Sequence, residues 1–193
     1  MVEYVRQEAL PVEKFGHQPR LYALARLVGV GEVYDDDALF AAAWLHDIGV
    51  FLGHRPEEPE ALARWDNVAY AVEKVPAILA RLGFPASKVA AVVEAIRTHL
   101  PSAEPTSVEG TILRDADILE QLGAIGILRA VCKVGRDTRY PTFTTAVNGL
   151  RKAAVTLPPQ LRSESAQAMA QSKIDILEAF LLAVEEESQG ALL

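Results

Sequence analysis

The chain has 193 residues, of which 50% are hydrophobic, and its formal net charge is −7 at pH 7. This length allows one domain with a substantial core. The acidic balance argues against a nucleic-acid polymer as the partner, because neutralising phosphates requires a basic surface. No run approaches the roughly 20 apolar residues that span a bilayer, and the N-terminus lacks the apolar centre of a signal peptide. We therefore expect a cytoplasmic protein with no membrane partner.

Composition and spacing predict an all-α fold, a single-domain bundle of about eight helices. Alanine and leucine are abundant, and proline, glycine and capping residues mark the helix ends. A short helix is expected at Val2–Leu10, and Pro76 should kink a later one. A capping box, Thr106-x-x-Glu109, should open another helix. The main predicted helices run from Gly16–His17 to Gly29–Gly31, from an acidic N-cap at Asp35–Asp37 to His46–Asp47, and from the Thr106–Glu109 capping box to Leu122. The others cover Leu62–Leu82, Val89–His99, Ile125–Val134, Pro141–Leu150 and Ser163–Glu186.

The only cysteine, Cys132, lies in an apolar run. It has no partner within the chain for a disulfide. We expect it to be a buried small hydrophobic residue.

Two adjacent residues with metal-binding side chains, His46 and Asp47, end the third predicted helix. His46 shares the apolar stripe of Leu39, Ala42 and Ala43, so it should face inward. Gly49 should end this helix close to the pair. A buried carboxylate is costly unless it is paired or bound to a metal, which makes this dipeptide a candidate site.

Two further polar residues occupy apolar stripes. His17 is in register with Leu21 and Val28, and Asp115 with Ile112 and Leu119. Together with His46 and Asp47 they offer two imidazoles and two carboxylates, a set that suits Mn²⁺, Fe²⁺, Co²⁺, Ni²⁺ or Zn²⁺. The alternative is that each residue has its own partner, such as Arg20 or Arg97 beside Asp115.

The order of these residues resembles the signature of the HD superfamily of metal-dependent phosphohydrolases, and in particular its small stand-alone members. The similarity covers roughly residues 13–128. It is carried by Gly16-His17-x-x-Arg20, Leu45-His-Asp-Ile-Gly49, Ala95-Ile-Arg-Thr-His99 and Asp115-Ala-Asp-Ile-Leu119, followed by Leu122-Gly-Ala-Ile-Gly126. The resemblance implies an all-α fold and a metal held by His17, His46, Asp47 and Asp115.

The chain also departs from this family in two places. Members with two metal ions usually have histidines where this sequence has Asn67 and Glu94. Asp66, His54 and His99 could partly substitute for these histidines, but the pattern favours one divalent transition metal. The Gly-Tyr-Pro motif of the cyclic-dinucleotide branch is absent from the sequence, so that activity is not expected.

The resemblance implies a hydrolase that cleaves a small phosphate ester, a nucleotide in the favoured case, by attack of a metal-activated water. Asp47 would bind the metal, and Asp115 would also orient the attacking water. Arg20, ahead of Arg55 and Arg97, would stabilise the phosphoryl charge. His99 would serve as a further donor, and His54 and His99 are the candidates for protonating the leaving oxygen. The loops Phe51–Pro59, Pro101–Pro105 and Gly135–Tyr140 would shape the pocket.

Two other functional classes stay open at this point. One is an HD-type di-iron oxygenase, against which Asn67 counts, and the other is a non-catalytic ligand-binding or regulatory HD module. We expect one HD-type domain over residues 1–193, with a core at about 13–135 and C-terminal helices at 141–187 that complete or cover it. The last helix would either cover this core or form a homodimer interface.

Overall fold

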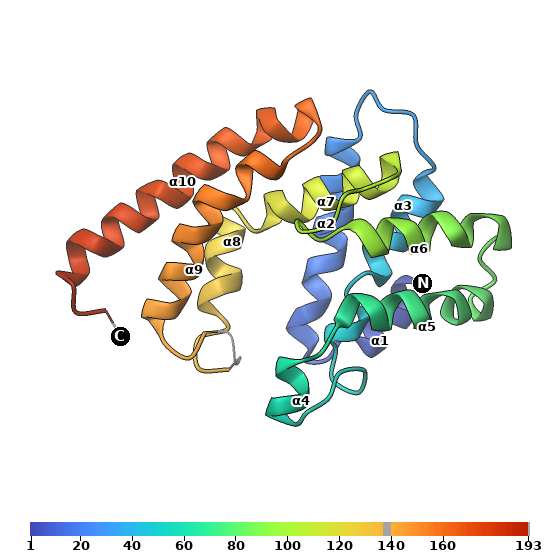
Figure 1. The fold of residues 1–193 in the computed structure, drawn as a ribbon, viewed down its shortest axis with the longest axis horizontal. Helices are drawn as coiled ribbons and strands as arrows, with labels where there is room; N and C mark the ends of the chain where they lie inside the picture. The colour runs from blue at the N-terminus through green and yellow to red at the C-terminus, as the bar shows by residue number, and fades with distance from the viewer. Residues whose placement is uncertain (137–139, 193) are drawn as a thin grey trace. The chain divides into compact units, whose positions relative to one another are not determined.

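The computed structural model describes residues 1–136 and 140–192 and confirms the all-α class (Figure 1). Ten α-helices and no strand occur in these residues. None of the helices described is both long and apolar enough to cross a membrane. The helices are α1 (Val2–Glu8), α2 (His17–Val28), α3 (Asp36–Leu45), α4 (Pro59–Ala63), α5 (Asn67–Arg81), α6 (Val89–Thr98), α7 (Val108–Glu120), α8 (Gly123–Val131), α9 (Phe143–Thr156) and α10 (Glu164–Ser188).

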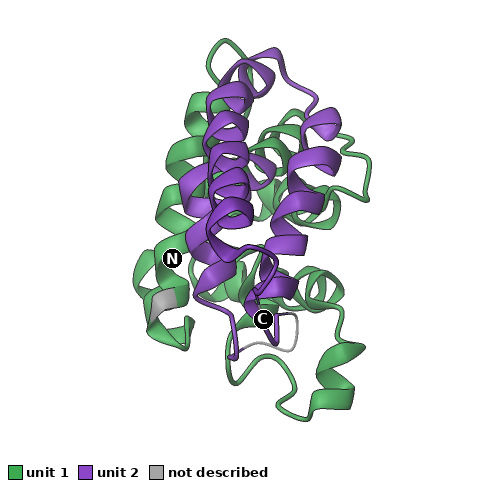
Figure 2. Cartoon of the chain, turned by 90° about the vertical axis from the view of Figure 1, so that its left-hand side faces the viewer, with its two compact units in different colours: residues 1–116 green, residues 117–193 purple. Residues whose placement is uncertain are grey.

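The chain forms two compact units, coloured separately in Figure 2. Unit 1 is Met1–Ala116 and unit 2 is Asp117–Leu193, so the boundary falls within the sequence of α7. The two units are described separately below. The single domain expected from the sequence stays a prediction.

In unit 1, α3 packs against α2 and α6, and α5 packs against α6 and the 3₁₀ turn Ile48–Val50. Nearly every side chain of α3 from Ala38 onward is buried, which is the pattern of a helix enclosed on all sides. Three consecutive alanines in this helix allow its neighbours to approach closely. The fully buried residues on the other helices of unit 1 include Leu21, Ala25, Val75, Leu79, Val92, Ile96, Ile112 and Leu113.

In unit 2, α8, α9 and α10 pack against one another, as Figure 1 shows. The buried apolar residues of this unit include Leu122, Ala130, Ala146, Val147, Leu150, Ala166, Ala170, Leu177 and Leu181. The prediction that Cys132 is buried is wrong, because this residue follows the last residue of α8 and its side chain is exposed. Of the predicted pocket loop Gly135–Tyr140, residues 137–139 lie outside the described residues.

Capping residues account for several helix starts. Asp35 caps α3 as its acidic cluster suggests, since its carboxylate accepts hydrogen bonds from the Asp37 and Ala38 amides. The capping box predicted at Thr106 and Glu109 is wrong. The Thr106 hydroxyl donates to Glu94 at 2.6 Å, and it is the Ser107 hydroxyl that accepts from the Gly110 amide at 3.0 Å.

The prediction of one long helix over Leu62–Leu82 is also wrong, because the helix is interrupted between α4 and α5. Asp66 causes the new start, since its carboxylate accepts a hydrogen bond from the Ala69 amide at 2.8 Å. Pro76, expected to kink the helix, lies inside α5 without ending it.

Candidate metal centre

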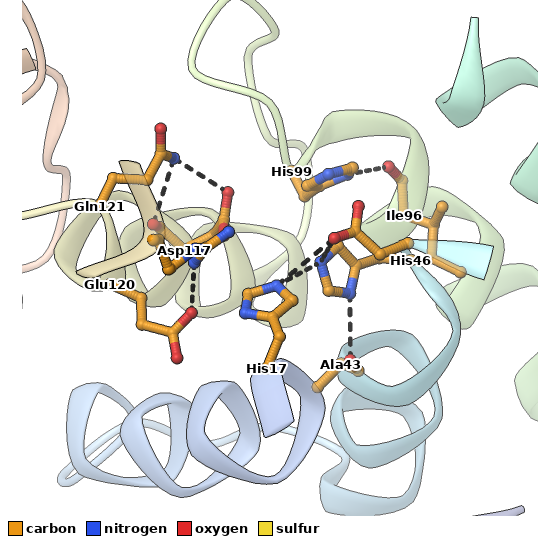
Figure 3. A network of polar contacts seen from close by, with 10 residues as sticks. His17, Ala43, His46, Ile96, His99, Asp117, Glu120 and Gln121 are labelled. Atoms are coloured by element: carbon orange, nitrogen blue, oxygen red, sulfur yellow. Dashed lines mark hydrogen bonds and ion pairs between the residues drawn. The ribbon is translucent and has the colours of Figure 1, made fainter. Parts of the chain in front are cut away.

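His46 stands at the C-terminal end of α3, where the last carbonyls of a helix lack partners within the helix. Its Nδ1 lies 3.0 Å from the carbonyl oxygen of Ala43 (Figure 3). A carbonyl oxygen only accepts, so Nδ1 carries the proton and donates it. In the neutral ring Nε2 is therefore the unprotonated nitrogen, which is the form that binds a metal. The residue is buried, with 1% of its surface exposed.

His99 repeats this arrangement at the C-terminal end of α6. Its Nδ1 donates to the carbonyl oxygen of Ile96 at 2.6 Å, which again leaves Nε2 as the acceptor (Figure 3). The rings of His46 and His99 meet edge to face, with centroids 5.0 Å apart. Ligand atoms of His46, Asp47 and His99 all lie within 4.8 Å of one another.

His17, the first residue of α2, completes the cluster from another direction. Its Nε2 lies 3.2 Å from the Nε2 of His46. The Oδ2 of Asp47 is 3.6 Å from each of these nitrogens. The Asp47 side chain is 21% exposed, whereas both imidazoles are nearly enclosed, so the cluster reaches solvent along its carboxylate.

These three atoms fit a divalent transition metal. Nitrogen and oxygen ligands at about 2.1 Å from such an ion lie about 3.0 Å apart at right angles and about 3.4 Å apart in a tetrahedron. The observed separations of 3.2–3.6 Å are close to these values. The C-terminal ends of α3 and α6 also place the negative ends of two helix dipoles here, which favours a cation.

Asp115, the fourth predicted ligand, is fully buried on α7, as its place on the apolar stripe indicates. It does not belong to the group formed by His46, Asp47 and His99, and its assignment as a ligand stays a prediction. Asp117, two residues further along α7, projects about 200° away around the helix axis. The two carboxylates therefore leave the helix in nearly opposite directions.

Asp117 begins unit 2, where it belongs to a polar network (Figure 3). It accepts a hydrogen bond from Gln121 at 3.1 Å, and Arg129 approaches it to 3.8 Å. Arg129 also pairs with Glu120. Buried carboxylates with a guanidinium between them are the expected way of keeping charge inside a helical unit.

Three arginines were candidates for binding phosphate, and the structure distinguishes them. Arg20 is exposed one turn after His17, with its guanidinium folded back over Gly16, where an added Cβ would lie 2.9 Å from Nη1. Arg97 pairs with Glu94 on its own helix. Arg55 is half-buried, and its Nε has no hydrogen-bond partner among the described residues.

His54, a candidate acid, is held by two residues that sequence spacing did not single out. Its Nε2 is 2.8 Å from a carboxylate oxygen of Glu8, and its Nδ1 is 2.9 Å from the hydroxyl of Tyr70. Only the tertiary fold brings these residues together, since Glu8 is 46 positions away in sequence. This ring is thus occupied on both nitrogens.

The prediction that Gly49 ends α3 is wrong, because that helix ends at Leu45. The role of Gly49 is steric. A Cβ at this position would lie 2.6 Å from the backbone oxygen of Asn67, so only glycine allows the start of α5 to come this close. The Trp65 indole donates to the Gly49 carbonyl at 2.7 Å. The backbone of Asn67 therefore packs directly on the turn that follows Asp47.

The family model described as "HD domain" matches residues 15–122, which is more than half of the chain. The chain belongs to the HD domain family. The matched segment contains His17, His46, Asp47, His99 and Asp115. No curated protein matched the sequence of this HD-domain protein.

Solved structures agree with this fold over nearly the whole chain. YpgQ from Bacillus subtilis is 22% identical, with a TM-score of 0.73 over 98% of this chain and 96% of that chain. The same protein in complex with ADP has a TM-score of 0.68 at 20% identity, over 98% of this chain and 99% of that one. A predicted HD superfamily hydrolase from an uncultured Thermotogales bacterium is 26% identical, with a TM-score of 0.64 over 96% and 90% of the two chains.

Proposed function

We propose that this HD-domain protein is a metal-dependent phosphohydrolase that cleaves a small phosphate ester. The observation that carries the proposal is the triangle of His17 Nε2, His46 Nε2 and Asp47 Oδ2, with sides of 3.2–3.6 Å. One divalent transition metal, from the set Mn, Fe, Co, Ni and Zn, would bind there. A carboxylate of α7 would be the fourth ligand, with Asp115 as the assigned residue.

When bound, such a cation supplies a water of lowered pKa and offsets negative charge on the phosphate. The remaining work belongs to side chains. Asp47, the most exposed member of the cluster, faces the side from which water and substrate arrive. Asp115 would accept a hydrogen bond from the attacking water and fix its direction toward phosphorus.

His99 and Arg20 would act on the two ends of the breaking bond. The Nδ1–H of His99 donates to the Ile96 carbonyl, so Nε2 is the nitrogen that would exchange a proton with the leaving oxygen. Arg20, exposed and one turn from His17, would contact the phosphoryl oxygens and stabilise charge as the bond breaks.

A nucleotide is the substrate class that we favour within this proposal. The support comes from YpgQ, which has the same fold and has been crystallised in complex with ADP. In the chain itself, an acidic surface with a few local arginines suits a small phosphorylated molecule better than a polymer.

The test begins with elemental analysis of the purified protein and of His46→Ala. We expect about one transition metal per chain in the wild type, and none in the variant, since His46 is one of the three clustered ligands. Hydrolysis of a nucleotide panel is then measured with Mn²⁺, Co²⁺ and Ni²⁺. A chain fully loaded with metal that leaves every phosphate ester intact would contradict the proposal.

The fourth ligand is tested with a matched pair, Asp115→Asn and Asp117→Asn, on the same helix. If Asp115 is the ligand, its variant loses metal and activity, while Asp117→Asn keeps both. The reverse result would transfer the role to Asp117 and leave the proposed reaction unchanged. Circular dichroism of both variants checks that loss of metal is not loss of fold.

A further inference from the structure

Unit 1 contains an open pocket of about 340 Å³, which none of the proposed metal ligands lines. We call it the α1–α5 pocket. Its polar lining comes from Tyr4 on α1, His54, and three residues of α5, Tyr70, Lys74 and Arg81. This volume lies at the lower end of the range of about 300–1,000 Å³ typical of small-molecule sites.

The spacing of residues along α5 creates the pocket. Lys74 and Arg81 are seven positions apart, so they lie on one face of the helix about 10.5 Å apart along its axis. Ala77 lies between them, and its small side chain leaves room above the helix. The result is an apolar floor, completed by Ile78, with one cationic group toward each end.

Two tyrosine rings form the aromatic part of the lining, and each is held by a cation. The Arg81 guanidinium carbon lies 4.9 Å from the centre of the Tyr4 ring, and the Lys74 Nζ lies 5.7 Å from that of Tyr70. The Tyr70 hydroxyl is further fixed by His54. Flat rings held in place are favourable partners for a flat ligand, because little side-chain freedom is lost on binding.

The charges of the lining favour an anion. Among the described residues, no carboxylate forms an ion pair with Arg81, whose contacts are with Tyr4. Lys74 pairs at 2.8 Å with exposed Glu73, and such a surface pair is weak enough to give way to a ligand. Glu8, a carboxylate that contacts the lining, is paired with His54. A local pair of cations stands out in a protein with a net charge of −7.

We propose that the α1–α5 pocket binds a small organic anion with a flat apolar body and a phosphate, phosphonate or carboxylate group. Arg81 would hold the anionic group with charge-assisted hydrogen bonds, and Lys74 would add a second cation. The rings of Tyr4 and Tyr70 would contact the flat body. This ligand site is separate from the proposed metal centre and does not depend on the proposed reaction.

The probe for the test is phenylphosphonate, whose carbon–phosphorus bond a phosphate esterase cannot hydrolyse. Binding is measured by titration calorimetry to the wild type, to metal-depleted wild type and to His46→Ala. We expect equal affinity in all three, and weaker binding of inorganic phosphate, which lacks the apolar body. Arg81→Gln should weaken phenylphosphonate binding about tenfold, as expected for the loss of a charge-assisted hydrogen bond. Lys152→Gln, an exposed lysine of α9, is the control that should change nothing.

A spectroscopic readout locates the probe independently. The ring centroids of Trp65 and Tyr70 lie 5.2 Å apart. In NMR spectra, the indole N–H signal of Trp65 should therefore shift on titration with phenylphosphonate, while that of Trp44 stays unchanged. The proposal is overturned if phenylphosphonate does not bind, or if Arg81→Gln folds and binds it as well as the wild type. It is also overturned if binding is lost both without metal and in His46→Ala, since the probe would then sit at the metal centre.

Discussion

Asp35 serves two elements at once in unit 1. Its carboxylate accepts hydrogen bonds from two amides at the start of α3 and from Lys88, whose Nζ lies 2.8 Å away. The hydrogen bond from Lys88, assisted by these amides, holds the pKa of Asp35 below its usual value, although partial burial acts in the opposite direction. The charged form is thus favoured in the folded state.

We expect Asp35→Ala to lower the free energy of unfolding by about 1–2 kcal/mol at pH 7, from the lost cap and a surface ion pair. Asp35→Asn keeps the acceptor oxygen and loses only the charge, so its cost should be smaller. Because the folded-state pKa is lowered, the charge contributes above the unfolded pKa of about 3.9 and its contribution fades as pH falls through the folded value. Urea unfolding at pH 7 and pH 3 should show the difference between wild type and Asp35→Asn shrinking in acid. A constant difference would contradict this account.

At this scale the sequence predicted burial well where a polar residue interrupts an apolar stripe. His17, His46 and Asp115 are all buried, as their spacing indicated. Cys132 is exposed. Its burial was predicted wrongly because a run that is apolar throughout does not indicate which face of the helix is covered. Contacts made only in the folded chain, such as Glu8 with His54, leave no periodic signal.

Among the elements, the turn after Asp47 depends on the fit between Gly49 and the first residue of α5. We expect Gly49→Ala to destabilise the protein by about 1–3 kcal/mol, because the new methyl group meets the backbone of Asn67. Since this turn directly follows Asp47, the variant should also retain less metal. Thermal unfolding and elemental analysis measure the two effects.

Gly16→Ala is the matched control. Gly16 has helical backbone angles, and an added methyl group would meet only the end of the flexible Arg20 side chain. We expect Gly16→Ala to change the free energy of unfolding by close to zero. The small cost of moving the Arg20 side chain is offset because alanine restricts the unfolded chain more than glycine does. Equal losses in the two variants would contradict a specific role for the contact between Gly49 and Asn67.

Helix existence followed from sequence more reliably than helix limits. Apolar spacing located most helices, but Asp66 divides a continuous apolar pattern by capping α5. Thr106 has the right neighbours for a capping box, yet its hydroxyl binds Glu94 on another helix. Whether a hydroxyl caps its own helix or reaches another one is decided by tertiary packing.

For the molecule as a whole, the proposed metal should act as a ligand of the folded state. A cation at one hundred times its dissociation constant adds about 2.7 kcal/mol of stability. For a chain of this size we expect Mn²⁺ to raise the midpoint of the transition that includes unit 1 by roughly 5–10 °C. Scanning calorimetry with and without Mn²⁺ measures the shift, and His46→Ala should abolish it. A shift of the same size in His46→Ala would place the cation elsewhere.

The fold class and the histidine cluster are the parts that the sequence predicts best. The all-α fold follows from composition and periodicity. His46 and Asp47 indicate a metal site because they are adjacent residues with metal-binding side chains at the end of an apolar helix. The α1–α5 pocket cannot be predicted from the sequence, because Lys74 and Arg81 resemble ordinary surface residues of α5. Only the folded chain brings Tyr4 against this helix.

The positions of His46 and His99 at the ends of their helices have a consequence for how the cluster would bind an ion. Each ring satisfies a carbonyl of its own last turn, so its rotamer and tautomer are set by the helix before any ligand arrives. Immobilising a side chain on binding costs about 0.5–1.5 kcal/mol. For these two rings the cost arises during folding, not when the ion binds. These two ligands are preorganised, so a cation can bind without rearranging them.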